Sequence, residues 1–407
     1  MTAATLVAAV GGCGSNTPRH PPQDRTAWIP LAPLARAPGA SGAVDGASIV
    51  DVNGIPYVVV VDRAGEAGQS HARVYRETRL GWTEPGTITG LTVDRDAPVD
   101  VVGGSRLCVS ALDEAQLRVR CLRGTRWQNM GGPVFVTSGE DTNAGALLTA
   151  RGALVVLRNR RIQPSGRFET TAWRWSRTRG WRSFGGDVAP DYPGGSQRPY
   201  GVTTRHGLCV AYDGLPADRT YGPDIALSCM RAGRWRVVRR LPAPAARSAG
   251  EQGMRVVSGA AAEGDTVRVG VQLMGSAGGS WDLHAGGPSE WRRAVRSDPG
   301  PGWTAQGELF NLRGAVWAIR FDQASRGPGW STLATRLVVL RERAGGFEQV
   351  GSPLRDADHF SGPVYFGLVR SGSRVLALAT VPMPDGAADA VRVFELRGAT
   401  SAPAAGS

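Results

Sequence analysis

The chain has 407 residues, 42% of them hydrophobic, and a formal net charge of +12. Its Lys+Arg total of 47 consists of arginine alone, because the sequence contains no lysine. Without lysine, a phosphate-binding loop of the GxxxxGK[ST] type is excluded, and no apolar run is long enough for a membrane-spanning helix. The arginine bias has two explanations that composition does not separate: codon usage in a GC-rich genome, or a surface that faces anions.

The first 25 residues carry a signal of their own. Val10-Gly11-Gly12-Cys13 places small residues directly before a cysteine, and a polar, Pro-rich stretch follows. We expect residues 1–13 to be a residual export signal ending in Cys13 as the lipidation site, and residues 14–25 to be a disordered tether. The signal lacks a positive charge and has a short apolar run, which a translation start further upstream would explain. Secretion without a lipid is the alternative.

A tryptophan recurs at a period typical of repeated supersecondary units. The successive spacings are 54, 45, 54, 54, 56 and 56 residues, and a phenylalanine takes the seventh place. A large ring at one fixed position of each unit is expected to pack between neighbouring units rather than to contact a ligand. The repeat positions are Trp28, Trp82, Trp127, Trp181, Trp235, Trp291 and Phe347.

Residues 47–85 show the pattern of one unit. An apolar stretch reaches the turn Asn53-Gly54, a buried strand and an alternating strand follow, and a strand around Trp82 ends the unit. Asn-Gly is a strong hairpin signal, and four short antiparallel strands, lettered A to D, make one propeller blade. The A–B turn glycine recurs seven times and gives the same count as the aromatic ring. These glycines are Gly54, Gly104, Gly152, Gly207, Gly264, Gly314 and Gly372.

The two ends of the repeat complement each other. The last unit reaches its C strand at Val391–Leu396 and lacks a D strand, while the strand Thr26–Leu31 carries a repeat tryptophan with no blade before it. Pairing these two segments would close the ring and remove exposed strand edges. The sequence therefore predicts an all-β fold: a seven-bladed β-propeller over residues 26–398, with four antiparallel strands per blade and the last blade closed by the N-terminal strand. We expect residues 399–407 to form a disordered tail.

Four of the five cysteines occupy matching places in two repeats. We expect them to form the cross-strand disulfides Cys108–Cys121 and Cys209–Cys229, each contributing roughly 3 kcal/mol. Such bonds persist outside the reducing cytosol. Four buried free thiols are the alternative.

Up-and-down strand order places D–A and B–C loops on one face of the disc, here called the loop face, and A–B and C–D turns on the other, the turn face. Arginines dominate the C–D turns, whereas the D–A loops carry carboxylates and amides. We therefore expect a basic turn face and an acidic loop face, with simple solvation of charged turns as the alternative.

A lipid at Cys13 would hold the basic face towards an anionic bilayer. The arginines are Arg76, Arg79, Arg123, Arg126, Arg177, Arg179, Arg231, Arg234, Arg341 and Arg343. The loop residues are Asp45, Asp94, Asp96, Glu140, Asp141, Asp187, Asp191, Glu251, Gln252, Gln306, Glu308, Asp356 and Asp358.

Three tryptophans outside the repeat positions suggest a ligand site on the loop face. We expect their indoles, in loops or loop edges of blades 5 and 6, to stack on a sugar ring while carboxylates and amides accept its hydroxyls. The alternative is that these indoles hold long loops onto the disc. The predicted ligand-binding residues are Trp281, Trp303, Gln306, Glu308, Trp330 and Asp358.

Signals for catalysis are weak. The sequence has no GxSxG and no HExxH, and its five histidines are scattered. Sialidases are propellers with SxDxGxxW turns, and the nearest run, Ser176–Trp181, lacks the aspartate. We therefore expect a non-catalytic protein with no cofactor. A glycan-active hydrolase with paired carboxylates at the channel mouth is the alternative, and a Ca²⁺ site is conceivable.

Taken together, the Cys13 segment and the repeat resemble bacterial surface lipoproteins built on a β-propeller. This resemblance implies a protein anchored by a lipid to the outer side of the cell membrane. Its expected partner is a glycan, a wall polymer or a protein bound on the loop face. We expect a monomer that does not bind nucleic acid.

Overall fold

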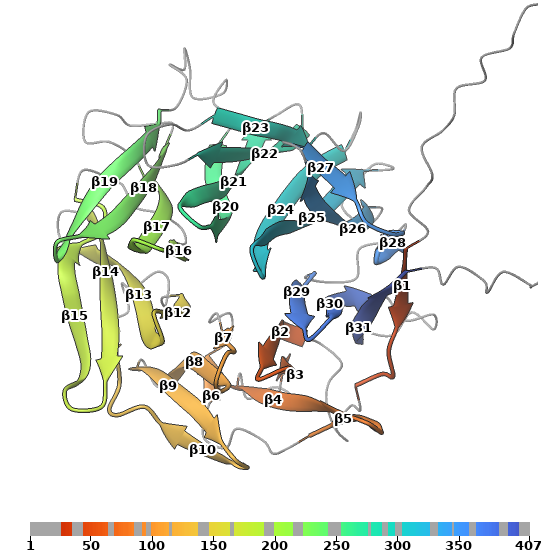
Figure 1. Ribbon diagram of the computed structural model, residues 1–407, viewed down its shortest axis with the longest axis horizontal. Helices are drawn as coiled ribbons and strands as arrows, with labels where there is room; N and C mark the ends of the chain where they lie inside the picture. The colour runs from red at the N-terminus through yellow and green to blue at the C-terminus, as the bar shows by residue number, and fades with distance from the viewer. Residues whose placement is uncertain are drawn as a thin grey trace, which may run out of the picture.

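The computed structural model of the chain is a ring of seven blades (Figure 1). The regular elements in the part of the chain that it describes are all β-strands, as the repeat predicts. The described residues are 26–34, 44–63, 69–84, 92–94, 99–113, 116–136, 146–162, 167–190, 199–214, 223–242, 254–275, 278–286, 292–297, 303–325, 333–343, 346–357, 364–381 and 390–398.

Each blade is an antiparallel sheet with the strand order A-B-C-D, and the A strands lie nearest the axis (Figure 1). In blades 1 to 7 the A strands are β2 (Val44–Val52), β7 (Asp100–Val102), β12 (Leu147–Ala150), β16 (Tyr200–Thr204), β20 (Met254–Glu263), β24 (Trp303–Leu312) and β29 (Phe366–Ser371). The B strands are β3 (Ile55–Arg63), β8 (Cys108–Asp113), β13 (Ala153–Ile162), β17 (Gly207–Gly214), β21 (Thr266–Gly275), β25 (Ala315–Ser325) and β30 (Arg374–Val381). The C strands are β4 (Gln69–Thr78), β9 (Gln116–Arg123), β14 (Arg167–Ser176), β18 (Asp224–Arg231), β22 (Gly278–Gly286), β26 (Leu333–Arg343) and β31 (Ala390–Arg397).

The D strands are the irregular members of the blades. In blades 1, 2 and 6 two short pieces pair with the same C strand, and in blades 3, 4 and 5 the C–D register shifts at one point. The D strands are β5 (Gly81–Thr83) with β6 (Thr92–Asp94), β10 (Arg126–Asn129) with β11 (Phe135–Val136), β15 (Gly180–Asp187), β19 (Arg234–Leu241), β23 (Arg292–Ser297), β27 (Gly346–Gln349) with β28 (Arg355–Ala357), and β1 (Ala27–Pro30).

All seven predicted A–B turn glycines have a positive φ, between 59° and 142°. Glycine adopts this backbone region without the steric penalty of a Cβ. In blade 1, Asn53 also has a positive φ of 52°, next to Gly54 at 82°, which is the pattern of a type I′ hairpin turn. The glycines therefore mark each blade because the turn geometry requires them.

The core consists of seven clusters of buried side chains, each between two adjacent blades. The valine-rich B strands lie at the centre of these clusters; Val58 and Val59, for example, face the two opposite neighbours of blade 1. Each blade therefore buries both faces of its sheet, and its stability depends on having a blade on either side.

The repeat tryptophans that the structure describes pack between neighbouring blades, as expected from their period. Trp28, Trp181 and Trp235 donate their indole N–H groups to backbone carbonyls of the preceding blade, at 2.7, 2.7 and 3.3 Å. Each acceptor lies three residues after the repeat aromatic residue of that preceding blade; the acceptors are Val350, Met130 and Phe184.

The ring closes as the sequence predicts. Strand β1 pairs antiparallel with β31, with Trp28 opposite Leu396. The same tryptophan packs against blade 6, where a Cβ on Gly351 would lie only 2.7 Å from its Cδ1. The N-terminal strand thus supplies the D strand and the repeat ring of blade 7.

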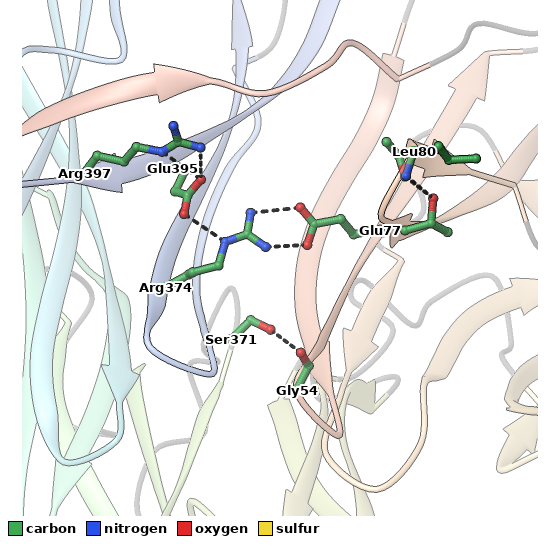
Figure 2. A network of polar contacts seen from close by, with 9 residues as sticks. Gly54, Glu77, Leu80, Ser371, Arg374, Glu395 and Arg397 are labelled. Carbon is green, nitrogen blue, oxygen red and sulfur yellow. Dashed lines mark hydrogen bonds and ion pairs between the residues drawn. The ribbon is translucent and has the colours of Figure 1, made fainter.

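Polar contacts reinforce the junction of blades 7 and 1 (Figure 2). The Arg374 guanidinium donates two hydrogen bonds to the Glu77 carboxylate, at 2.7 and 2.8 Å, and a third to Glu395 at 2.9 Å. The Ser371 hydroxyl donates to the carbonyl of Gly54 at 2.8 Å. Bidentate arginine–carboxylate pairs are strong and directional, so this network fixes the last blade against the first.

Both predicted disulfides are present. Cys108–Cys121 and Cys209–Cys229 each join a B strand to its C strand, and the paired Cα atoms are 4.0 Å apart. Disulfides are typical of oxidising compartments, which indicates a protein that works outside the reducing cytosol. Among the described residues, no helix of sufficient length and apolar character to traverse a bilayer occurs.

Candidate functional site

A cavity of about 480 Å³ lies in the centre of the ring. Its walls come from the A strands of six blades: β2, β7, β12, β16, β24 and β29. In most of these strands the lining residues belong to the N-terminal half, which is the half next to the loop face. The cavity therefore occupies the loop-face end of the central channel.

Ionisable and aromatic side chains line this cavity together. Asp45, Asp100 and Glu308 provide carboxylates from blades 1, 2 and 6, and Tyr200 and Tyr365 provide rings with hydroxyl groups from blades 4 and 7. Each of these residues also interacts with neighbouring groups of the protein. The lining is therefore acidic and partly ordered by its own contacts.

Asp100 has a structural task as well. Its Oδ2 accepts a hydrogen bond from the backbone N–H of Leu147, at 3.3 Å, which links blade 2 to blade 3. Apolar surface completes the wall, including the rings of Phe310 and Phe366. Hydrogen-bond acceptors next to aromatic surface can hold a molecule that has hydroxyl or amino groups and an apolar face.

Of the predicted site residues, Glu308 lines the cavity. Gln306 is exposed and lies two residues before it on β24, so it shares the same face of the sheet, closer to the loop-face end. The expectation that both lie in a D–A loop is wrong, because β24 begins at Trp303 and is longer than most other A strands.

Trp303 begins β24 but is absent from the cavity wall. The Arg336 guanidinium lies over its ring, 4.8 Å from the centroid. Arg336 in turn pairs with Asp322, which is fully buried and also pairs with Arg320 at 2.7 Å. This indole is therefore part of a packed ionic cluster within blade 6.

The placement of Trp281 in a loop or loop edge is also wrong. Trp281 lies within β22 with no exposed surface, and its Nε1 donates to Ser258 Oγ at 2.9 Å. Two glycines leave the space for its ring: a Cβ on Gly270 or Gly307 would lie 2.9 or 2.5 Å from it. An indole enclosed in this way has no face available to a sugar.

Several other predictions fall outside the described residues. Trp330, Asp358, Cys13 and most of the acidic D–A loop residues lie there, so the acidic loop face stays a prediction. The prediction that the turn face is basic throughout is wrong, because turns of blades 1, 5, 6 and 7 carry carboxylates, such as Glu77, Asp265, Glu348 and Glu395. Within the described part, no group of three or more His, Cys, Asp or Glu side chains is placed to hold a metal ion.

Sequence analysis missed the cavity residues Asp100, Tyr200, Phe310 and Tyr365. A positional signal for them exists: Tyr200 and Tyr365 each lie seven residues before their A–B turn glycine. Residues at similar distances from equivalent turns reach similar heights along the channel. Counting back from the turn glycines would have grouped these two rings.

Fold and site together define the chain as a seven-bladed β-propeller with a polar cavity at its centre. It matches no protein-family model and no curated protein. Similar solved structures include the acylaminoacyl peptidase of Pyrococcus horikoshii, with a TM-score of 0.51 and 10% identity over 89% of this chain and 53% of that one. The chain thus spans about half the length of this peptidase.

The β-propeller domain of the Trilobed protease from Pyrococcus furiosus has a TM-score of 0.50 and 9% identity, over 86% of this chain and 96% of that one. That domain has an open velcro topology, whereas β1 closes the ring here. The six-bladed fucose-binding lectin of Aleuria aurantia aligns with a TM-score of 0.43 and 16% identity, over 80% of this chain and 97% of that one. At these identities the likeness concerns the fold alone.

Proposed function

We propose that this protein is a non-catalytic binding module that takes a neutral or amine-bearing sugar unit of a glycan or wall polymer into the central cavity. The observation that carries the proposal is the cavity itself: about 480 Å³, with carboxylates, phenols and phenyl rings among the residues that line it from several blades. Binding pockets for small ligands commonly have volumes of roughly 300–1,000 Å³. The acidic lining disfavours anionic sugars.

The test is a glycan array with the full chain, covering neutral, amino and acidic sugars, followed by affinity measurements on variants. Asp45→Asn and Glu308→Gln should each weaken binding about tenfold or more, since each removes a charge-assisted hydrogen bond. Glu348→Gln, on the turn face, is the matched control and should bind normally. Binding to acidic sugars only, or equal affinities in all variants, would contradict the proposal.

The variant Trp303→Ala distinguishes the central cavity from the surface around Trp303 as the place where the ligand binds. Because Arg336 covers this indole and the residue does not line the cavity, we expect the variant to retain its affinity. A selective loss of binding in this variant would move the site to the loop-face end of blade 6, around Trp303 and Arg336.

The hydrolase alternative has its own readout. If the protein released reducing ends from a bound glycan, and Asp45→Asn or Glu308→Gln abolished this release, the protein would be a hydrolase and not a non-catalytic binding module. No release from any glycan that the protein binds would support the non-catalytic assignment.

We also propose export and lipid attachment at Cys13, supported by the disulfides and by the residues before this cysteine. In a bacterial host, the wild-type chain should fractionate with membranes and carry a lipid mass at Cys13. The Cys13→Ser variant should be recovered as a soluble protein. A wild-type chain that is soluble and has an unmodified cysteine would contradict the proposal.

A further inference from the structure

The turn face is basic in blades 2, 3 and 4. The turn segments of these blades, residues 101–110, 119–130, 148–156, 172–184, 202–210 and 228–238, contain several arginines but no aspartate or glutamate. All of these segments belong to the described part of the chain. The corresponding turns of the other blades do contain carboxylates.

Three arginine pairs stand out in this sector because their members lie directly opposite each other on neighbouring strands. Arg123 pairs with Arg126 in blade 2, and Arg231 with Arg234 in blade 4, at the C–D hairpin ends. In blade 3, Arg174 pairs with Arg182 across β14 and β15. All six side chains are exposed. These six arginines are called the basic rim below.

Placing like charges directly opposite each other destabilises a sheet. Among the described residues, no carboxylate forms an ion pair with any arginine of the basic rim. The unfavourable arrangement nevertheless occurs in three successive blades. A bound anion would relieve it, because two guanidinium groups can share one carboxylate or sulfate group through charge-assisted hydrogen bonds.

The rest of the turn face is different. In blades 5, 6 and 7, arginines pair with carboxylates of the same chain: Arg268 with Glu263 at 3.4 Å, Arg343 with Glu348 at 3.2 Å and Arg397 with Glu395 at 2.8 Å. Arg374 is held by Glu77 from blade 1. Among the described residues, the uncompensated pairs lie on one side of the ring, which a general arginine bias from codon usage would not produce.

The shape of the sector indicates the kind of partner. The C and D strands of blades 2, 3 and 4 follow one another along the outer edge of the ring, so the three pairs form an arc (Figure 1). A flat bilayer would also meet the carboxylate-bearing turns of the other blades. A single-stranded nucleic acid would need exposed rings for stacking, and the described tryptophans of this sector are buried or half-buried.

We propose that the basic rim binds a linear acidic polysaccharide, whose carboxylate or sulfate groups contact successive arginine pairs. The disulfides indicate an environment outside the cytosol, which favours this polymer over nucleic acid. The site lies on the face opposite the mouth of the central cavity, so the proposal is independent of the sugar-binding function proposed above.

The test uses the full chain with two probes, heparin for sulfate and polygalacturonate for carboxylate. The variant Arg123→Ser/Arg174→Ser/Arg231→Ser removes one member of each pair. It should bind both probes at least about tenfold more weakly, with a smaller dependence of affinity on salt. Its melting temperature should be unchanged or higher, since the like-charge contacts are relieved.

The matched control removes three charges from the same face in blades 6 and 7: Arg313→Asn, Arg343→Ser and Arg397→Ser. It should lose less than about threefold in affinity, because two of these arginines are already paired with carboxylates. Equal losses in the two triple variants would show that net charge alone drives binding and would overturn the proposal.

The variant Arg123→Lys/Arg174→Lys/Arg231→Lys keeps the charge of the basic rim and controls for misfolding. We expect it to bind more weakly than the wild type, since an ammonium group lacks the planar bidentate geometry. Two further probes identify competing partners. The proposal would be overturned if the protein bound anionic lipid vesicles and neither polymer competed for this binding. It would also be overturned if the protein bound duplex DNA more tightly than both polymers at the same salt concentration.

Discussion

Replacement of Trp28 by alanine tests the closure of the ring. This tryptophan belongs to the short strand β1, which pairs with β31 and completes blade 7. Its side chain is only 7% exposed, packs among residues of blades 6 and 7, and donates to the carbonyl of Val350 at 2.7 Å. One side chain therefore couples the first strand of the chain to two blades near its end.

The size of the effect follows from two losses. Truncation of a buried aromatic ring to alanine costs roughly 3–5 kcal/mol, and a carbonyl left without its donor adds about 1 kcal/mol. We expect Trp28→Ala to lower the free energy of unfolding by about 4–6 kcal/mol. Trp28→Phe keeps most of the apolar contact and loses the N–H donor, so we expect a loss of about 1–2 kcal/mol.

Urea unfolding followed by near-UV circular dichroism measures these differences, and hydrogen exchange locates them. Amides of β1 and β31 should exchange faster in Trp28→Ala, while those of blade 3 keep their protection. Ile29→Ala is the control on the same strand: this side chain is 39% exposed, and we expect a loss below about 1 kcal/mol. A loss below about 1 kcal/mol in Trp28→Ala, with unchanged exchange in β31, would refute this account of closure.

Three further predictions concern stability. Gly351→Ala should lower the melting temperature, with a cost of roughly 1–3 kcal/mol, because φ is 72° and the added Cβ would lie 2.7 Å from Trp28; a neutral result would mean that the indole moves aside freely. Reduction of both disulfides should lower the free energy of unfolding by roughly 3 kcal/mol for each bond, measured by urea titration with and without a reductant; unchanged midpoints would contradict this. Burial raises the pKa of Glu395, but hydrogen bonds from Arg397 and Arg374 outweigh it and leave the pKa below 4.5. The stabilisation by this carboxylate is therefore present above pH 4.5 and is lost as the pH falls through the lower folded-state pKa. The difference in the free energy of unfolding between the wild type and Glu395→Gln should therefore shrink on acidification. A difference that stays constant with pH would argue against the network.

The location of the candidate site depended on contacts that local sequence does not encode. The cavity wall takes Asp45, Asp100 and Glu308 from three separate blades, and no short motif contains them. Trp281 and Trp303 look alike in the sequence, yet their surroundings differ. Trp281 is enclosed by a glycine of its own blade and a glycine of the next blade, whereas Trp303 is half-buried under an arginine. Charge compensation has the same origin: Arg374 and Glu77 are 297 residues apart, so the sequence showed basic turns but could not show which of them are neutralised.

The sequence by itself determined the number of blades, the closing strand and the disulfides. These features depend on local rules repeated along the chain: glycine where the backbone needs a positive φ, a large ring at one place in each blade, and cysteines in matching strand positions. Only the tertiary structure decided which side chains line the cavity, which indoles are enclosed and which arginines lack a carboxylate partner among the described residues. Those properties arise where blades that are distant in sequence meet, and the identity of a residue does not reveal its neighbour across such an interface.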